Sequence, residues 1–282
     1  MTIAVCVKVH DGLVLAADSA STLMEGISVI NVYNNANKVF NLYKGLPIGV
    51  VTWGAGGIGP ASISTLMKDL RNRLMGRDQN HQEYRIDRTN YTMEDVSQKT
   101  RRFFFEENYL TVFQNQPPNE KPPLGFMLAG YSSRQGLPEV LEIFISQGGN
   151  CEQPRLIRPQ EVCGINWNGE PEAITRIVCG FGTQLPRVLE ELGVPPEQTA
   201  QAMSQIQARL EAFLAIPAMP IQDAIDLTRF LVEATIMFKR FSPGAPTVGG
   251  PVEVAAITKH EGFKWVERKY YFDSRINPKE DQ

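Results

Sequence analysis

The chain has 282 residues, of which 43% are hydrophobic, and it carries a formal net charge of −3. This composition is typical of a globular protein with a sizeable core. The sequence has no basic block, so nucleic acid is not an expected partner. It also has no run of about 20 apolar residues, the length that a membrane helix requires.

The N-terminal 18 residues do not have the features of a signal peptide, because no basic region precedes their apolar residues. We therefore expect a cytoplasmic protein. The four cysteines lack the paired short spacing of zinc sites, and the three histidines lie far apart in the sequence. We expect neither a metal nor a cofactor, and we interpret most of the cysteines as core thiols.

The first half of the chain predicts pairs of strands followed by two helices. An Asp11-Gly12 turn between apolar runs is a strong hairpin signal, and Thr92 with Asp95 three residues later predicts a helix start. Residues 76–91 are polar and predict a surface loop. The predicted strands cover 2–9, 12–18, 38–42 and 47–53, and the predicted helices cover 63–75 and 92–113.

The second half predicts strands, then helices, then strands again. Its expected strands cover 124–131, 140–146, 252–259 and 263–271, and its expected helices cover 172–178, 184–192, 197–214 and 221–241. Strands and helices thus occur in blocks and do not alternate as in βαβ units. This order predicts an α+β fold in which antiparallel sheets are covered by helices, as a layered sandwich.

The N-terminal segment resembles the start of mature proteasome β-subunits and of the related bacterial protease HslV. In that family a catalytic N-terminal threonine is followed by an acidic residue and then by a threonine that holds the substrate backbone. Counted from Thr2, these positions fall on Asp18 and Thr22 without a gap. The resemblance implies that Thr2 is the nucleophile once Met1 has been removed.

Two further family landmarks follow in the sequence. The stretch 37–40, Asn-Lys-Val-Phe, matches the segment of the catalytic lysine and assigns that role to Lys38. The predicted strand 47–53 ends at Gly54, which matches the glycine whose N–H serves the oxyanion. Gly56, in the same glycine-rich stretch, is the second expected substrate-binding residue beside Thr22. This stretch lacks the Gly-Lys-Ser/Thr ending of a phosphate loop.

The resemblance covers most of the chain and implies one domain, 1–282, with the four-layer αββα sandwich of the N-terminal-nucleophile (Ntn) hydrolases. Insertions at about 77–92 and 193–219 lengthen it relative to a standard β-subunit. Phe181 stands where the family has a supporting serine, and Ser242 and Thr247 are the hydroxyls that could replace it or be ordinary loop residues. The stretch 246–251 resembles the bacterial Anbu branch of the superfamily.

The chemistry of these residues is that of a threonine peptidase. The Thr2 hydroxyl can attack a carbonyl while its α-amine, with a pKa of about 7.7–8.0, accepts the proton. The ammonium of Lys38 keeps that amine unprotonated, and Asp18 holds Lys38 in place. Gly54 lets backbone N–H groups approach the oxyanion, and Thr22 aligns the peptide as an added strand.

The family resemblance also implies partners. We expect a peptide or unfolded-protein substrate, a self-compartmentalised homo-oligomer (a ring or a spiral), and a separate unfoldase if unfolding is driven by ATP, because the chain has no Walker motif. Two alternatives stay open. One is an Ntn amidase or transpeptidase that uses the same site, and the other is a non-catalytic scaffold subunit of the proteasome type.

Overall fold

A computed structural model describes residues 2–25 and 28–269, and two five-stranded antiparallel sheets form its centre. The first sheet has the order β12-β1-β2-β13-β14, with strands Gly164–Gly169, Ile3–Val9, Gly12–Ala17, Glu253–Thr258 and Gly262–Glu267. The second sheet has the order β11-β10-β9-β6-β5, with strands Arg155–Arg158, Glu139–Ile145, Leu124–Gly130, Ile48–Gly54 and Val39–Asn41. The predicted α+β class with antiparallel sheets is therefore confirmed.

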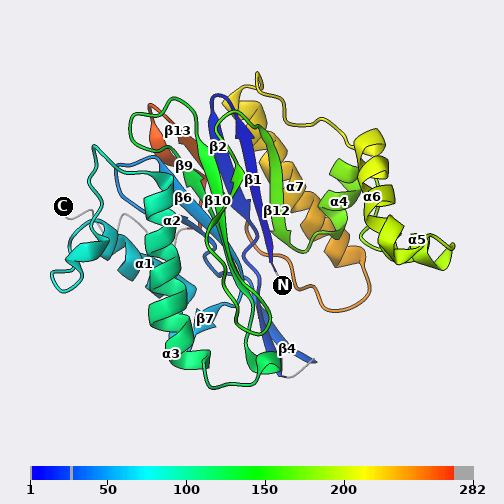
Figure 1. Ribbon diagram of the computed structural model, residues 1–282, viewed down its shortest axis with the longest axis horizontal. Coiled ribbons are helices and arrows are strands. Elements are labelled where there is room, and N and C mark those ends of the chain that lie inside the picture. The colour runs from blue at the N-terminus through cyan, green and yellow to red at the C-terminus, as the bar shows by residue number, and fades with distance from the viewer. Residues whose placement is uncertain (1, 26–27, 270–282) are drawn as a thin grey trace.

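Helices lie on both sides of the pair of sheets (Figure 1). On one side are α1 (Ile63–Leu74), α2 (Met93–Arg101), the π-helical η2 (Arg102–Tyr109) and α3 (Leu110–Phe113). On the other side are α4 (Glu172–Cys179), α5 (Leu185–Glu191), α6 (Pro196–Leu210) and α7 (Ile221–Phe241). None of the helices in residues 2–25 and 28–269 is long and apolar enough to cross a membrane.

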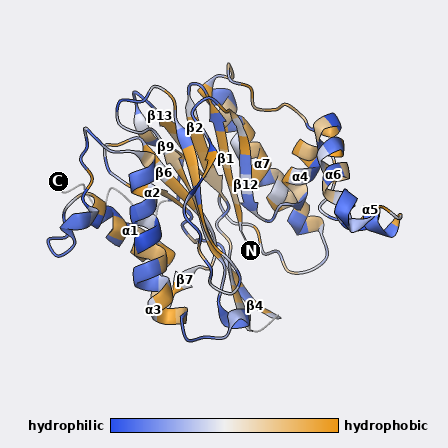
Figure 2. Cartoon of the chain, in the orientation of Figure 1, coloured by the Kyte–Doolittle hydropathy of each residue, from blue (hydrophilic) through white to orange (hydrophobic). Residues whose placement is uncertain are grey.

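The burial of β1 shows why its sequence is almost continuously apolar. Every residue of β1 and β2 is buried, which is expected for strands that are covered on both faces. Ile3 and Val5 pack in the cluster that contains residues of α4 and α7, whereas Ala4 and Cys6 pack in a cluster with residues of the second sheet. The apolar strands therefore form the middle of the molecule (Figure 2).

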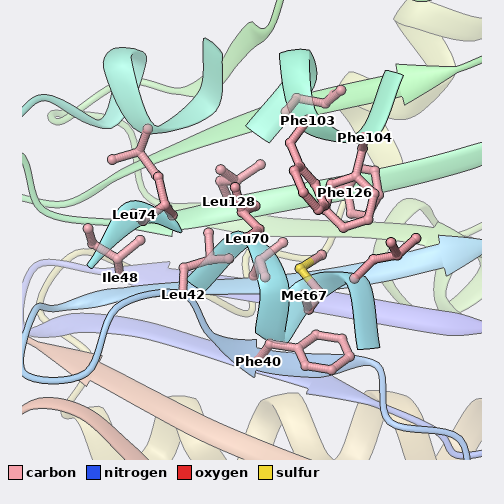
Figure 3. Packing of buried hydrophobic residues seen from close by; sticks show 14 of the residues in the cluster. Phe40, Leu42, Ile48, Met67, Leu70, Leu74, Phe103, Phe104, Phe126 and Leu128 are labelled. Atoms are coloured by element: carbon pink, nitrogen blue, oxygen red, sulfur yellow. The ribbon is translucent and has the colours of Figure 1, made fainter. Parts of the chain in front are cut away.

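A third cluster joins the second sheet to the helices on its outer face. Met67 and Leu70 of α1 meet Phe104 of η2 and Phe126 of β9 there (Figure 3). The apolar spacing that predicted the helix 63–75 is the spacing of the residues that α1 buries. The predicted helix start at Thr92 is confirmed as well, because its Oγ1 accepts a hydrogen bond from the Asp95 N–H at 3.1 Å.

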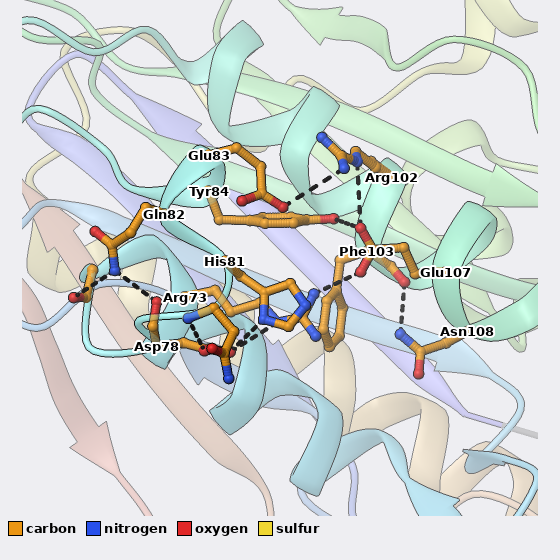
Figure 4. Close-up of polar contacts among 12 residues, drawn as sticks. Arg73, Asp78, His81, Gln82, Glu83, Tyr84, Arg102, Phe103, Glu107 and Asn108 are labelled. Carbon is orange, nitrogen blue, oxygen red and sulfur yellow. Dashed lines mark hydrogen bonds and ion pairs between the residues drawn. The ribbon is translucent and has the colours of Figure 1, made fainter.

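One local expectation was wrong, and two strand regions were not predicted. Residues 76–91 are not merely a surface loop: they contain η1 (Gln82–Tyr84) and bury the side chain of Tyr84. Tyr84 donates to Glu107 of η2, and Glu83 pairs with Arg102 of η2 (Figure 4). The segment after β2, which no predicted strand covers, forms a hairpin of β3 (Ser21–Glu25) and β4 (Ser28–Tyr33). The region of β12 was not predicted as a strand either. Trp167 lies there opposite Val5 of β1 and packs against the cluster formed with α4 and α7.

The remaining short elements are connectors. They are β7 (Gly57–Ile58), β8 (Ala61–Ser62) and η3 (Pro118–Glu120). The helix predicted over 197–214 ends at Leu210, and the last predicted strand ends at Glu267. Residues 270–271, which that prediction included, lie outside the described residues.

Candidate active site

A cavity of about 340 Å³ lies at the end of β1. Thr2, Thr22, Lys38, Gly54 and Gly56 all line it, which are five of the six residues predicted for the site. Asp18 is fully buried and contacts Lys38. Further polar side chains on the wall belong to Ser21, Asn37, Thr52, Ser62 and Ser64. The fold therefore brings together residues that are spread over the first quarter of the chain.

Thr2 lies beside β12, the edge strand of the first sheet. It is 4% exposed, and its carbonyl accepts a hydrogen bond from the Glu170 N–H at 2.7 Å. A Cβ at Gly169, where φ is +102°, would lie 1.8 Å from the Thr2 carbonyl oxygen. Only glycine allows β12 to approach this closely. Met1, whose removal the nucleophile requires, lies outside the described residues.

Asp18 joins the start of β1, directly after Thr2, to three other segments. Its Oδ1 accepts from the Ile3 N–H at 3.0 Å and from Lys38 Nζ at 2.6 Å. Its Oδ2 accepts from the N–H groups of Ala20 and Gly249, each at 3.0 Å. A buried carboxylate requires this degree of pairing, because an unpaired charge in the interior is very costly.

Lys38 precedes β5 and points its ammonium at Asp18. Burial lowers the pKa of Lys38 below its ordinary value, the charge and hydrogen bond of Asp18 oppose that shift, and Lys269 adds to it. The lysine is 5% exposed, yet it lines the cavity that Thr2 also lines. A cation in this position acts on a neighbouring amine by like-charge repulsion, which favours the unprotonated form of that amine.

A second buried acid and base lie beside this pair, and the sequence analysis missed both. Lys269 Nζ donates to Ser19 Oγ at 2.5 Å and to the Ala36 carbonyl at 2.6 Å, and it lies 3.6 Å from Glu253 Oε2. Glu253 is 1% exposed, and burial raises its pKa against the opposing effects of Lys269 and the Lys38 backbone N–H. The sequence feature that could have indicated this second acid is a glutamate at the start of the apolar run 253–258.

The two glycines that line the cavity, Gly54 and Gly56, differ in how strictly the structure requires glycine at their positions. Gly54 has φ +90°, and a Cβ there would lie 2.3 Å from the Pro123 carbonyl oxygen. Packing of β6 against the segment before β9 is thus enough to require glycine at this position. A Cβ at Gly56 would lie 3.3 Å from Ser21 Oγ. The Gly56 carbonyl accepts a hydrogen bond from the Ile63 N–H at 3.0 Å.

Thr22 lies in β3, opposite Val32 of β4. The β3–β4 hairpin extends beyond the two central sheets (Figure 1). Its first two residues, Ser21 and Thr22, line the cavity. Thr22 therefore lies where an extended chain could reach both the hairpin and Thr2.

The three positions related to the missing serine lie apart from this cavity wall. Phe181 packs against the cluster formed with α4 and α7. Ser242 donates to the Phe238 carbonyl at 2.8 Å and so binds the end of α7. Thr247 is buried, and its Oγ1 has no hydrogen-bond partner among the described residues. None of the three lines the cavity that contains Thr2.

The described residues contain no group of three or more His, Cys, Asp or Glu that could hold a metal ion. No protein-family model matches the chain, and no curated protein matches it. The function of the chain is therefore inferred from its residues and their geometry.

Proposed function

We propose that the chain is a threonine peptidase of the proteasome β-subunit type, a member of the Ntn hydrolases, with Thr2 as nucleophile after removal of Met1. One observation carries the proposal: Thr2 and Lys38 line the same cavity, and Asp18 binds both Lys38 and the strand that begins after Thr2. An exposed lysine alone, or an aspartate at the end of a strand alone, would not indicate a catalytic site. Their convergence on Thr2 gives a nucleophile a buried cationic neighbour.

In this mechanism the Thr2 hydroxyl attacks the peptide carbonyl. The free α-amine accepts the hydroxyl proton and passes it to the leaving amine, so the C–N bond breaks as an ester to Thr2 forms. Water then attacks the ester and restores the hydroxyl. Lys38 favours the unprotonated α-amine, Asp18 orients Lys38, and the backbone N–H of Gly54 is the proposed donor to the developing oxyanion.

The proposal extends to the architecture. We infer that the two antiparallel sheets and the helices outside them are the four-layer αββα sandwich of a single domain, 1–282. Three separate apolar clusters support this, one between the sheets and one on each outer face. The insertions at about 77–92 and 193–219 then contain η1 and the whole of α6, respectively.

The expected partners belong to the same proposal: a peptide or unfolded-protein substrate, copies of the chain in a ring or spiral, and a separate unfoldase, in the cytoplasm. Large apolar side chains remain exposed on the side of α4–α7. Phe213 is 84% exposed and Phe241 is 76% exposed. Exposed aromatic residues on one side of a chain support contact with another subunit.

Intact mass after treatment with a peptide epoxyketone tests the proposal, because this inhibitor needs both the hydroxyl and the free amine of an N-terminal threonine. We expect loss of Met1 and one adduct per chain. Thr2→Ala should abolish the adduct, while Thr111→Ala, at an exposed threonine on α3, should retain it.

A chain that retains Met1, or a processed chain that forms no adduct, would contradict the proposal and favour the non-catalytic scaffold. An adduct without hydrolysis of peptides, but with transfer to added amines, would instead identify the amidase or transpeptidase alternative. Product analysis by mass spectrometry separates these outcomes.

A further inference from the structure

A second cavity of about 150 Å³ adjoins the cavity of Thr2. Asn37 and Ser64 line both cavities, and Asn37 Nδ2 donates to Ser64 Oγ at 3.4 Å. This hydrogen-bonded pair thus stands at the boundary between the two. We call the smaller cavity the basic recess, because its wall contains four cationic side chains: Lys44, Lys68, Arg71 and Arg268.

Three separate segments supply these cations. Lys68 and Arg71 lie three residues apart on α1, a spacing that places both side chains on one helix face. Lys44 lies between β5 and β6, and Arg268 follows β14. Their convergence is therefore a product of the tertiary fold and not of a charged run in the sequence.

Among the described residues, the cations of the basic recess outnumber its acids. None of the four cations forms a salt bridge with a described residue. Arg71 Nε donates to the Asn41 carbonyl at 2.7 Å, and the Arg268 guanidinium lies 4.7 Å from the centre of the Trp265 ring. Burial, followed by repulsion from Arg268 and Arg77, lowers the pKa of Arg71.

One acid, Glu253, also lines the recess. Lys269 lies 3.6 Å from its Oε2, and the charge of Arg268 also acts on it. This one carboxylate therefore faces Lys269 and the four cations of the recess, which keeps a net positive charge among the described residues. A volume of about 150 Å³ is smaller than the roughly 300–1,000 Å³ of pockets that hold a whole small ligand. The recess thus has the size for one anionic group and the guanidinium donors that bind a carboxylate well.

We propose that the basic recess binds the carboxylate of an acidic side chain in a peptide held at Thr2, so that the chain selects substrates with Asp or Glu near the bond to be cleaved. This inference rests on the proposed peptidase function, because the bound peptide is a substrate only if the chain cleaves peptides. The anion site itself does not depend on catalysis. A peptide in the larger cavity would pass Asn37 and Ser64 and direct its acidic side chain between Lys68 and Arg71.

The test is equilibrium binding to the full chain with Thr2→Ala, which cannot turn the peptide over. Fluorescently labelled peptides carry Glu or Gln at one position, and that position is moved along the peptide. At one position we expect the Glu peptide to bind about tenfold more tightly than its Gln partner, the strength of a charge-assisted hydrogen-bonded contact. Lys68→Glu should remove this preference.

Lys259→Glu is the matched control, because Lys259 is an exposed lysine that lines neither cavity. It makes the same change in charge and should keep the tenfold preference. Lys44→Glu serves as a second variant of the recess at another exposed position, so the result does not depend on the folding of one variant. Inorganic phosphate should displace the Glu peptide in competition.

Equal affinities of Glu and Gln peptides at every position would overturn the proposal, as would an equal loss of preference in Lys68→Glu and Lys259→Glu. Phosphate binding that depends on Lys68 without any Glu preference would assign the recess to a free anion and overturn the substrate assignment. Cleavage of the Gln peptide by the unsubstituted chain is measured separately, so failure of the peptidase proposal is seen independently of the recess.

Discussion

Two ionic clusters in this molecule differ in burial. In the first, Lys38 and Asp18 form a 2.6 Å ion pair whose side chains are 7% and 0% exposed. In the second, Arg73 forms a 2.6 Å ion pair with Glu107, and these side chains are 17% and 29% exposed. Tyr84 also donates to Glu107 at 2.6 Å (Figure 4).

The comparison shows that similar distances have different consequences. Removing one partner of a buried pair leaves an uncompensated charge in the interior, whereas water partly screens the charges of a pair that is partly exposed. The Arg73–Glu107 cluster holds residues 76–91 against η2, which is a structural role. The Asp18–Lys38 pair lies at the candidate site, where pairing also decides the charge next to Thr2.

The largest effect is expected from Asp18→Asn. The amide cannot balance Lys38, and its NH₂ group would face N–H donors, so the unfolding free energy should fall by about 3–5 kcal/mol. Urea denaturation measures this loss, and epoxyketone labelling should be abolished. Asp95→Asn is the control, because Asp95 is half-exposed and pairs with Lys99 on one helix. It should cost about 0.5 kcal/mol or less.

Gly54→Ala tests whether the cavity wall tolerates a side chain. The positive φ and the 2.3 Å approach of the new Cβ to Pro123 oxygen predict a loss of about 1–3 kcal/mol from backbone strain, besides the overlap. Gly56→Ala, whose Cβ meets only Ser21 Oγ at 3.3 Å, should cost less. Equal unfolding midpoints of the two variants in urea would show that the strand end at Gly54 can move.

The pH dependence of stability tests the second buried acid. The ordinary pKa of Glu253 is 4.5, and burial raises it in the folded chain. Above pH 4.5 the folded state then keeps a proton that the unfolded state has released, so the unfolding free energy falls as pH rises through the folded pKa.

The amide of Glu253→Gln cannot titrate, so this variant should lack that decrease in unfolding free energy. Urea midpoints from pH 4.5 upward measure the difference between the variant and the unsubstituted chain. Glu94→Gln, at an exposed position on α2, is the matched control for the substitution. Parallel curves for Glu253→Gln and the unsubstituted chain would rule out the titration of Glu253 in the folded state.

The smallest effect is expected from Glu107→Gln in the half-exposed cluster. The amide keeps an acceptor for Tyr84, and loss of the charge should reduce the unfolding free energy by about 1 kcal/mol or less. Epoxyketone labelling at Thr2 should be unchanged. A loss as large as that of Asp18→Asn would show that the two clusters do not differ in the way their burial indicates.

Local patterns were sufficient for much of the fold. The apolar spacing of 63–75 predicted α1, the Thr92 cap predicted the start of α2, and the Asp11-Gly12 turn predicted the β1–β2 hairpin. The β3–β4 hairpin was missed because the sequence of β4, which is largely exposed, shows no clear alternation of apolar and polar residues. β12 was missed because a tryptophan between two asparagines is not a typical strand pattern.

By itself the sequence determined the elements whose signal lies within a few residues, and it determined which six residues to consider for the site. Only the tertiary structure decided that five of them share one cavity. It also decided that Asp18 binds Gly249, which is 231 positions away, and that Lys269 meets Glu253 and Ser19. Periodicity and capping act through neighbours along the chain, whereas the pairing of buried charges depends on which strands the packed core brings together.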